Sequence, residues 1–157
     1  MCEAAGTTES TARGRRLGSA QLAVWRSLLR THALVVRRLE GDLLAEHDLP
    51  LASYDVLVQL VEAPGHQLRM TELADRVLLS RSGLTRLVDR LEREGLVRRE
   101  ACSDDARGLN AVLTDAGYER LRAASPTHLR GIEEYVVARL TPDELHRLGE
   151  ILAKLLV

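Results

Sequence analysis

Apolar residues return at three- and four-residue steps along much of this chain of 157 residues, which is the spacing of one face of an α-helix. The first such series starts at Leu22 and predicts a long amphipathic helix that runs to about Ala45. Residues 1–18 are rich in Gly, Ser, Thr, Ala and Arg and lack this periodicity. They predict a flexible tail in front of the helix, which we take as residues 19–46.

Three shorter helices are predicted next from their capping residues and from the breakers that follow them. The first begins at Pro50 and stops at Ala63-Pro64-Gly65. The second runs from Glu72 to Val77, with Thr71 as its cap. The third is capped by Ser80 or Ser82 and runs to Glu94, directly before Gly95. Two β-like runs follow, Leu96–Glu100 and Leu109–Leu113, on either side of the polar segment Cys102–Gly108. This pattern predicts a β-hairpin with a polar turn.

Two helices are predicted after the hairpin. Thr114 caps the first, and Pro126 within it is expected to kink or break it. Thr141-Pro142-Asp143-Glu144 has the form of a capping box with proline at the first helical position, and predicts the last helix.

A short helix, a brief link, a longer helix and a hairpin form, in this order, a winged helix-turn-helix. We therefore expect a mainly α fold with a small β-hairpin wing and a winged domain at residues 47–114. The segments 19–46 and 115–157 carry more apolar surface than so small a domain could cover. Pairing two chains would bury these stripes, so both segments are predicted to be dimerisation helices.

The helix that ends at Glu94 has two chemically different faces at about 100° per residue. Its apolar stripe consists of Leu84, Leu87, Val88 and Leu91, and the opposite face carries Ser82, Arg86, Asp89 and Arg93. Such a face suits the major groove, because arginine can fork onto guanine and hydroxyls can take several base edges. The alternative is a solvated face with local ion pairs, for example Arg90 with Glu94.

The polar turn of the hairpin ends in Arg107-Gly108. A guanidinium at a hairpin tip beside such a helix can enter the minor groove, and Asp105 could orient it through a bidentate pair. The alternative is an ordinary solvated hairpin tip.

Charge and composition narrow the classes of function. The 22 basic and 23 acidic side chains leave a net charge of −1, so any grip on nucleic acid must be local. Cys2 and Cys102 provide no disulfide framework, and no signal peptide or membrane span is evident, which together favour the cytoplasm. The five histidines lack metal-site spacing. The sequence contains no glycine-rich phosphate loop and no nucleophile motif, so we expect neither an enzyme nor a bound cofactor.

In order and spacing, these motifs resemble the core of the MarR (multiple antibiotic resistance regulator) family over residues 51–121. The matching segments are Met70-Thr71-Glu72-Leu73-Ala74, Leu79-Ser80-Arg81-Ser82-Gly83-Leu84-Thr85-Arg86-Leu87-Val88-Asp89-Arg90-Leu91-Glu92, Gly95-Leu96-Val97, Asp105-x-Arg107-Gly108 and Leu113-Thr114-x-x-Gly117. With the flanking helices, the resemblance covers nearly all of the chain apart from the tail.

The resemblance implies a homodimer that places two winged domains on a pseudo-palindromic operator in double-stranded DNA. It assigns base contacts to Ser82, Thr85 and Arg86, a phosphate contact to Arg81, and the wing contact to Arg107, with Asp105 as its orienting partner. The implied function is a sequence-specific transcriptional regulator, more often a repressor. The alternative is a winged-helix protein-interaction module without specific DNA binding.

Many members of this family release DNA when a small phenolic or anionic molecule binds between the dimer helices and the winged domain. Here the lining could include Trp25, Arg26 and His32 from the first helix and Tyr54 from the second. An indole, an imidazole and a phenol could hold an aromatic acid, with the arginine near its charge. The alternative is that Trp25 and Tyr54 pack in the core or in the dimer interface.

Overall fold

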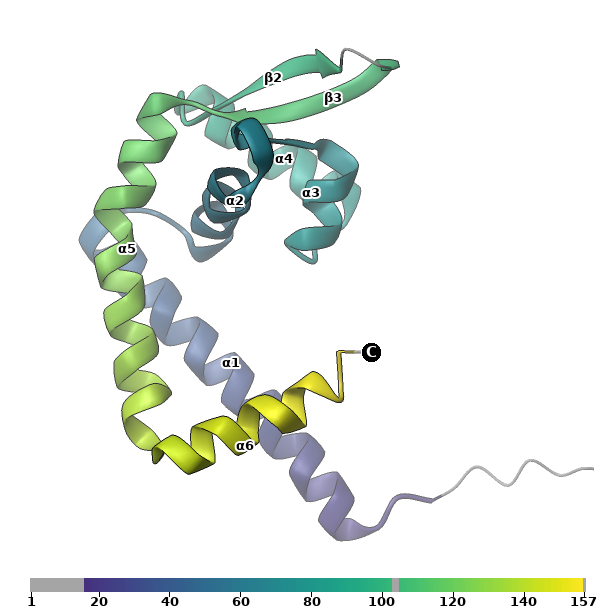
Figure 1. The fold of residues 1–157 in the computed structure, drawn as a ribbon, viewed down its shortest axis with the longest axis vertical. Helices are drawn as coiled ribbons and strands as arrows, with labels where there is room; N and C mark the ends of the chain where they lie inside the picture. The colour runs from purple at the N-terminus through teal and green to yellow at the C-terminus, as the bar shows by residue number, and fades with distance from the viewer. Residues whose placement is uncertain (1–15, 103–104, 157) are drawn as a thin grey trace, which may run out of the picture. The chain divides into compact units, whose positions relative to one another are not determined.

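The computed structural model describes residues 16–102 and 105–156, with the backbone alone for 105–107. Most of the tail predicted for residues 1–18 therefore lies outside the described residues. The elements (Figure 1) are, in order, α1 Ser19–His47, α2 Leu51–Glu62, the 3₁₀ turn η1 Pro64–His66, β1 Gln67–Arg69, α3 Met70–Arg76, α4 Arg81–Arg93, β2 Val97–Cys102, β3 Asp105–Leu113, α5 Asp115–Tyr135, the 3₁₀ turn η2 Val137–Arg139 and α6 Pro142–Ala153. The contacts divide the chain within α1, after Ala33, and all later elements belong to the second unit.

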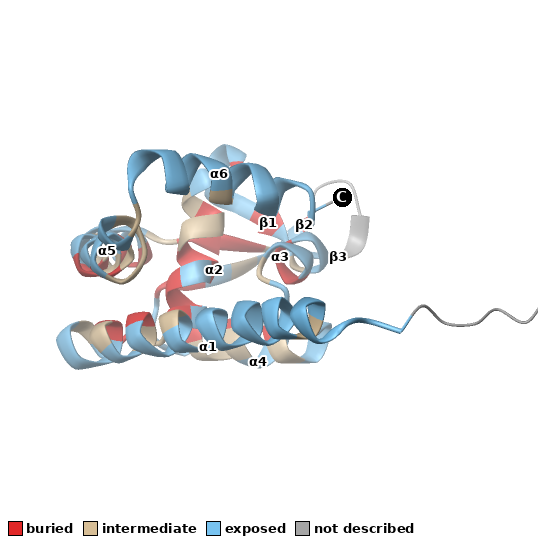
Figure 2. Ribbon diagram, turned by 90° about the horizontal axis from the view of Figure 1, so that it is seen from below, coloured by how far each residue is buried: buried red, intermediate tan, exposed pale blue. Residues whose placement is uncertain are grey.

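The core of this second unit is built almost entirely from leucine, valine and alanine, and α2 lies at its centre (Figure 2). Val56, Leu57 and Leu60 of α2 have no exposed surface. The inward sides of α3 and α4 complete this core, with Leu73 and Val88 equally buried. Burying a leucine or valine side chain contributes about 1.5–3 kcal/mol, so these helices are fixed mainly by their apolar stripes.

The three strands form one antiparallel sheet in the order β1-β3-β2. The β2–β3 hairpin, which we call the wing hairpin, confirms the prediction, whereas β1 was not predicted. Only Leu68 of its three residues is buried, and such a short stretch has no recognisable alternation.

The wing hairpin is longer than predicted, because Asp105–Gly108 belong to β3 and not to the turn. Ala101 pairs with Leu109 whereas Cys102 pairs with Asp105, so β3 bulges between these two pairs. A polar stretch without alternating apolar residues does not distinguish a strand from a turn.

Local capping chemistry sets the starts of α4, α5 and α6. The hydroxyl oxygens of Ser80 and Thr114 accept the N–H of Gly83 and Gly117, respectively, and Thr141 forms the predicted capping box with Glu144. The predicted Thr71 cap is wrong: α3 starts at Met70 because β1 runs directly into it, with Arg69 at the N-cap. Helix α5 continues through Pro126 to Tyr135, so this proline does not break it.

The helices α1 and α6 retain large exposed apolar side chains. No residue of α6 is buried within the chain, although its leucines recur at helical spacing, and most of the helix is coloured as exposed in Figure 2. The exposed large apolar side chains on these two helices are Val24, Trp25, Leu28, Leu29, Leu34, Val36, Leu44, Leu145, Ile151 and Leu152. Surfaces of this kind are typical of interfaces.

Gly117 in the first turn of α5 provides a test of how closely α5 packs on the segment that leads into β2. A Cβ there would lie 2.1 Å from the backbone oxygen of Leu96. Gly117→Ala is therefore expected to lower the free energy of unfolding by at least about 2 kcal/mol, measured by urea denaturation at fixed protein concentration. Gly41→Ala is the control, since nothing lies within 4 Å of that Cβ, and a gain of about 0.5–1 kcal/mol is expected. Equal stability of the two variants would contradict the close packing.

Candidate nucleic-acid interface

Helix α4 presents one side to the core and the other to solvent. Leu84, Val88 and Leu91 are at most 1% exposed, and Leu87 packs against them at the edge. The predicted apolar stripe is thus confirmed. Burial of this stripe fixes the rotation of the helix about its axis, and the outward side carries the four predicted residues Arg81, Ser82, Thr85 and Arg86, all of them exposed.

Short hydroxyl side chains gather at the start of α4. The Ser80 oxygen accepts the N–H of Gly83 at 3.1 Å and lies 3.3 Å from the Ser82 hydroxyl. Thr85 donates its hydroxyl to the carbonyl of Arg81 at 2.9 Å. This bond fixes the Thr85 rotamer and leaves the lone pairs of its oxygen available to an external donor.

The arginines of α4 fall into two groups. In the second half of the helix, Arg90 donates to Ser53 at 2.5 Å and pairs with Glu94 at 3.4 Å. Arg93 donates to the carbonyl of Asp89 at 3.2 Å. Within the part of the chain that the structure describes, the side chains of Arg81 and Arg86 make no hydrogen bond or ion pair. Hydrogen bonds and one ion pair thus engage the arginines in the second half of α4.

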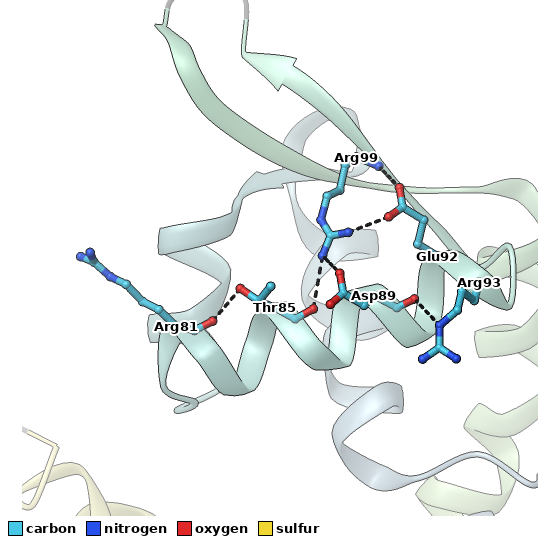
Figure 3. A network of polar contacts seen from close by, with 6 residues as sticks. All are labelled: Arg81, Thr85, Asp89, Glu92, Arg93 and Arg99. Carbon is cyan, nitrogen blue, oxygen red and sulfur yellow. Dashed lines mark hydrogen bonds and ion pairs between the residues drawn. The ribbon is translucent and has the colours of Figure 1, made fainter.

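Arg99 of β2 is a structural residue that sequence reasoning missed (Figure 3). Its guanidinium donates to the Asp89 carboxylate at 2.6 Å, to the Glu92 carboxylate at 2.6 Å and to the carbonyl of Thr85 at 3.2 Å. Its backbone N–H donates to the second Glu92 oxygen at 3.0 Å. We call this set of bonds the Arg99 clamp. Asp89, assigned by helical angle to the outward face, is half-exposed and is bound by this clamp.

Asp105 and Arg107 both lie in β3. The expectation that Arg107 sits at the hairpin tip is therefore wrong, because the strand extends from it to Asp105. Their side chains lie outside the described residues, so the predicted pair between them stays a prediction.

A groove of about 520 Å³ lies beside α4 and the wing hairpin. Two arginines and one carboxylate contribute polar groups to its lining, and Met70 and Leu109 contribute apolar surface. Its lining consists of Arg69, Met70, Thr71, Thr85, Asp89, Arg99, Gly108 and Leu109. The groove thus adjoins both surfaces that the sequence assigns to DNA.

The four residues assigned to a small-molecule site lie in different surroundings. Trp25, Arg26 and His32 are exposed on the first part of α1. Tyr54 is 5% exposed, donates its hydroxyl to Ser125 of α5 at 3.4 Å, and so packs in the core as the alternative interpretation held.

His128, which sequence reasoning did not single out, packs against Tyr54 with ring centroids 4.4 Å apart. Burial lowers the pKa of His128 below that of a free histidine, because the interior disfavours the charged ring. Its Nδ1 atom is buried and has no partner among the described residues.

Other chemistry is limited in the described part of the chain. It contains no group of three or more His, Cys, Asp or Glu side chains that could hold a metal ion. The Cys102 thiol is buried and donates to the Asn110 amide oxygen at 2.9 Å. No helix among the described residues has the length and apolar character needed to cross a membrane.

Comparison with known proteins identifies the family. The MarR family model matches residues 47–108. The repressor YetL of Bacillus subtilis strain 168, described as an HTH-type transcriptional repressor, is 31% identical over 117 residues, covering 72% of this chain and 70% of YetL.

Two solved structures from Streptomyces coelicolor share the fold. The MarR family transcriptional regulator Sco3205, solved in complex with DNA, superimposes with a TM-score of 0.84 at 42% identity, over 90% of this chain and 89% of Sco3205. The MarR family regulator AbsC gives a TM-score of 0.83 at 35% identity, over 90% and 95% of the two chains. The exposed helix, the wing and these similarities lead to one conclusion: the chain belongs to the MarR family of transcriptional regulators.

Proposed function

We propose that this regulator binds a pseudo-palindromic operator in double-stranded DNA as a homodimer, acts as a cytoplasmic repressor, and is released by a small ligand. The observation that carries DNA binding is the division among the arginines of α4. Arg81 and Arg86 extend from the outward face without a partner among the described residues, beside the hydroxyls of Ser82 and Thr85. Their guanidinium groups are thus available to phosphates and base edges.

In this proposal α4 reads the major groove with the first half of its outward face. Arg86 forks onto guanine, Ser82 and Thr85 contact base edges, and Arg81 binds phosphate. Arg107 approaches the minor groove from the wing hairpin, oriented by Asp105. The net charge of −1 is compatible with this arrangement, because the cations act locally and not through a global field.

The dimer follows from the apolar surfaces of the terminal segments. In the proposed domain division, residues 19–46 and 115–157 join two chains and residues 47–114 bind DNA. A twofold axis then presents two α4 helices to half-sites about 34–36 Å apart, which is one turn of DNA.

Ligand release and repression are the finer parts of the proposal. The exposed indole, guanidinium and imidazole of Trp25, Arg26 and His32 suit an aromatic acid. Tyr54, the phenol assigned from the sequence, is 5% exposed and lies in the core. YetL is described as a repressor, which favours repression over activation. Ligand-dependent loss of operator binding, measured with a panel of phenolic and anionic compounds, tests this part.

Selection of bound sequences from random duplex DNA by the purified protein tests the central proposal. Recovery of an inverted repeat, with affinity that falls steeply as salt rises, supports it. A protein-interaction module would yield no enriched sequence and no such salt dependence.

Arg86→Ala is expected to cost about 1–3 kcal/mol of specific binding and to relax preference at one base pair of each half-site, because the bidentate contact is lost. Arg93→Ala is the matched control, since that side chain already donates to Asp89 within the helix. The affinities of both variants and of the wild-type protein are measured over a series of operators that differ at single base pairs. A variant with unchanged affinity and preference would remove Arg86 from the base contacts.

Arg107→Ala should weaken binding to all operator variants by similar factors and flatten the salt dependence, since the minor groove offers a degenerate pattern of acceptors. Asp105→Ala should do the same more mildly, and Arg107→Lys should restore part of the loss because the charge remains. Titrations at two salt concentrations measure this. A sharp change in sequence preference would mean that Arg107 reads bases directly.

Leu148 and Leu152 provide the test of the dimer, because both lie on the apolar stripe of α6 and neither is buried within the chain. Replacing both with glutamate should give monomeric or unfolded protein, since two chains cannot bury four new carboxylates in one apolar interface. Arg147→Glu on the same helix is the control. Sedimentation that shows a folded dimer of the double variant would exclude these residues from the interface.

A further inference from the structure

Arg99 joins the wing hairpin to α4 across two helical turns, from Thr85 to Glu92 (Figure 3). Its side chain is 19% exposed, whereas the carboxylate side chains of Asp89 and Glu92 are 47% and 39% exposed. A planar guanidinium can serve three acceptors in fixed directions, which a lysine ammonium on a flexible stem cannot do with the same geometry. The clamp therefore constrains both the position and the orientation of β2.

The wing hairpin is also joined to α4 through the chain itself. Helix α4 and β2 are joined through Gly95, whose φ of 74° is in the left-handed region, and the Leu96 N–H donates to the carbonyl of Leu91 at 2.9 Å. Beyond this junction, Arg99 pairs with Ala111 of β3. A bond that holds Arg99 thus holds both strands of the wing hairpin.

We propose that Arg99 is a positioning residue for DNA binding, which sets the separation between the outward face of α4 and the wing residue Arg107. Arg107 lies four residues along β3 from Ala111, in the bulge between Leu109 and Asp105, so a rotation of β2 displaces it. The proposal rests on the DNA binding proposed above. Once α4 has bound the DNA, the contact of Arg107 with the same DNA is an intramolecular step. Its effective concentration depends on where the wing hairpin holds Arg107 relative to α4.

The clamp also neutralises Asp89 and Glu92, and this second effect requires a separate variant. Two unpaired carboxylates on a DNA-facing helix would repel phosphates whatever the position of the wing. If Arg99 acts by neutralising these carboxylates, its effect on DNA affinity does not depend on Arg107. Only positioning acts through Arg107.

The experiment is a double-mutant cycle of Arg99→Met and Arg107→Ala, measured as the affinity of the full-length protein for its selected operator. Methionine keeps most of the aliphatic stem and removes the fork. Arg98→Met is the matched control: the neighbouring side chain is half-exposed and bonds to Glu100 of its own strand. Thermal unfolding of every variant establishes that the assays compare folded protein.

The expected result is a loss of about tenfold or more for Arg99→Met in the wild-type background and less than about threefold in the Arg107→Ala background. Arg98→Met should weaken binding by less than about threefold in either. A purely structural role would lower thermal stability without depending on Arg107. If Arg99→Met does not fold, Arg99→Lys takes its place, and a smaller loss that again disappears in the Arg107→Ala background is expected.

Three results would overturn the inference. One is unchanged operator affinity in the folded Arg99 variant, and another is an equal loss in both backgrounds. The third is restored affinity when Asp89→Asn and Glu92→Gln are combined with Arg99→Met, since charge neutralisation would then suffice. Wild-type protein without salt-dependent DNA binding would instead refute the proposed function, so the two failures are distinguishable.

Discussion

The burial of one side of α4 is the constraint on which the rest of the structure depends. Leu84, Val88 and Leu91 are fully enclosed by the winged unit, and a helix held along such a stripe cannot rotate about its axis without exposing it. Because of this burial, Arg81 and Arg86 point outward without any contact of their own side chains to hold them there. The same burial sets the direction of the Asp89 and Glu92 carboxylates, to which the Arg99 guanidinium of the wing hairpin donates.

Sequence patterns predicted the parts of the fold that local rules determine. The stripe of α4, the Ser80 and Thr114 caps and the Thr141–Glu144 capping box depend on residues within one or two helical turns of each other. The features that were missed depend on distant partners. Strand β1 exists because β3 offers it an edge, and the start of α3 moved because that strand runs directly into the helix. The length of the wing hairpin likewise arises from pairing across the two strands.

The candidate site shows the same division between local and distant information. The helical angle placed Arg86 outward, but it could not show which arginines are engaged elsewhere. Arg90 is held by Ser53, which is 37 residues away, and the clamp joins residues of a helix and a strand. Among the described residues, the guanidinium groups of Arg81 and Arg86 have no partner, whereas those of Arg90 and Arg93 are bound within the chain.

The two successive arginines of β2, Arg98 and Arg99, have a consequence for how the strand chooses its alignment. Neighbouring residues of a strand face opposite sides of the sheet, so a slip by one position would offer α4 the Arg98 guanidinium in place of that of Arg99. Electrostatics alone would barely distinguish the two alignments. The same slip would turn Val97, which is 1% exposed, from the core to water. Apolar packing thus selects the register of β2, and the ion pairs only reinforce a choice already made.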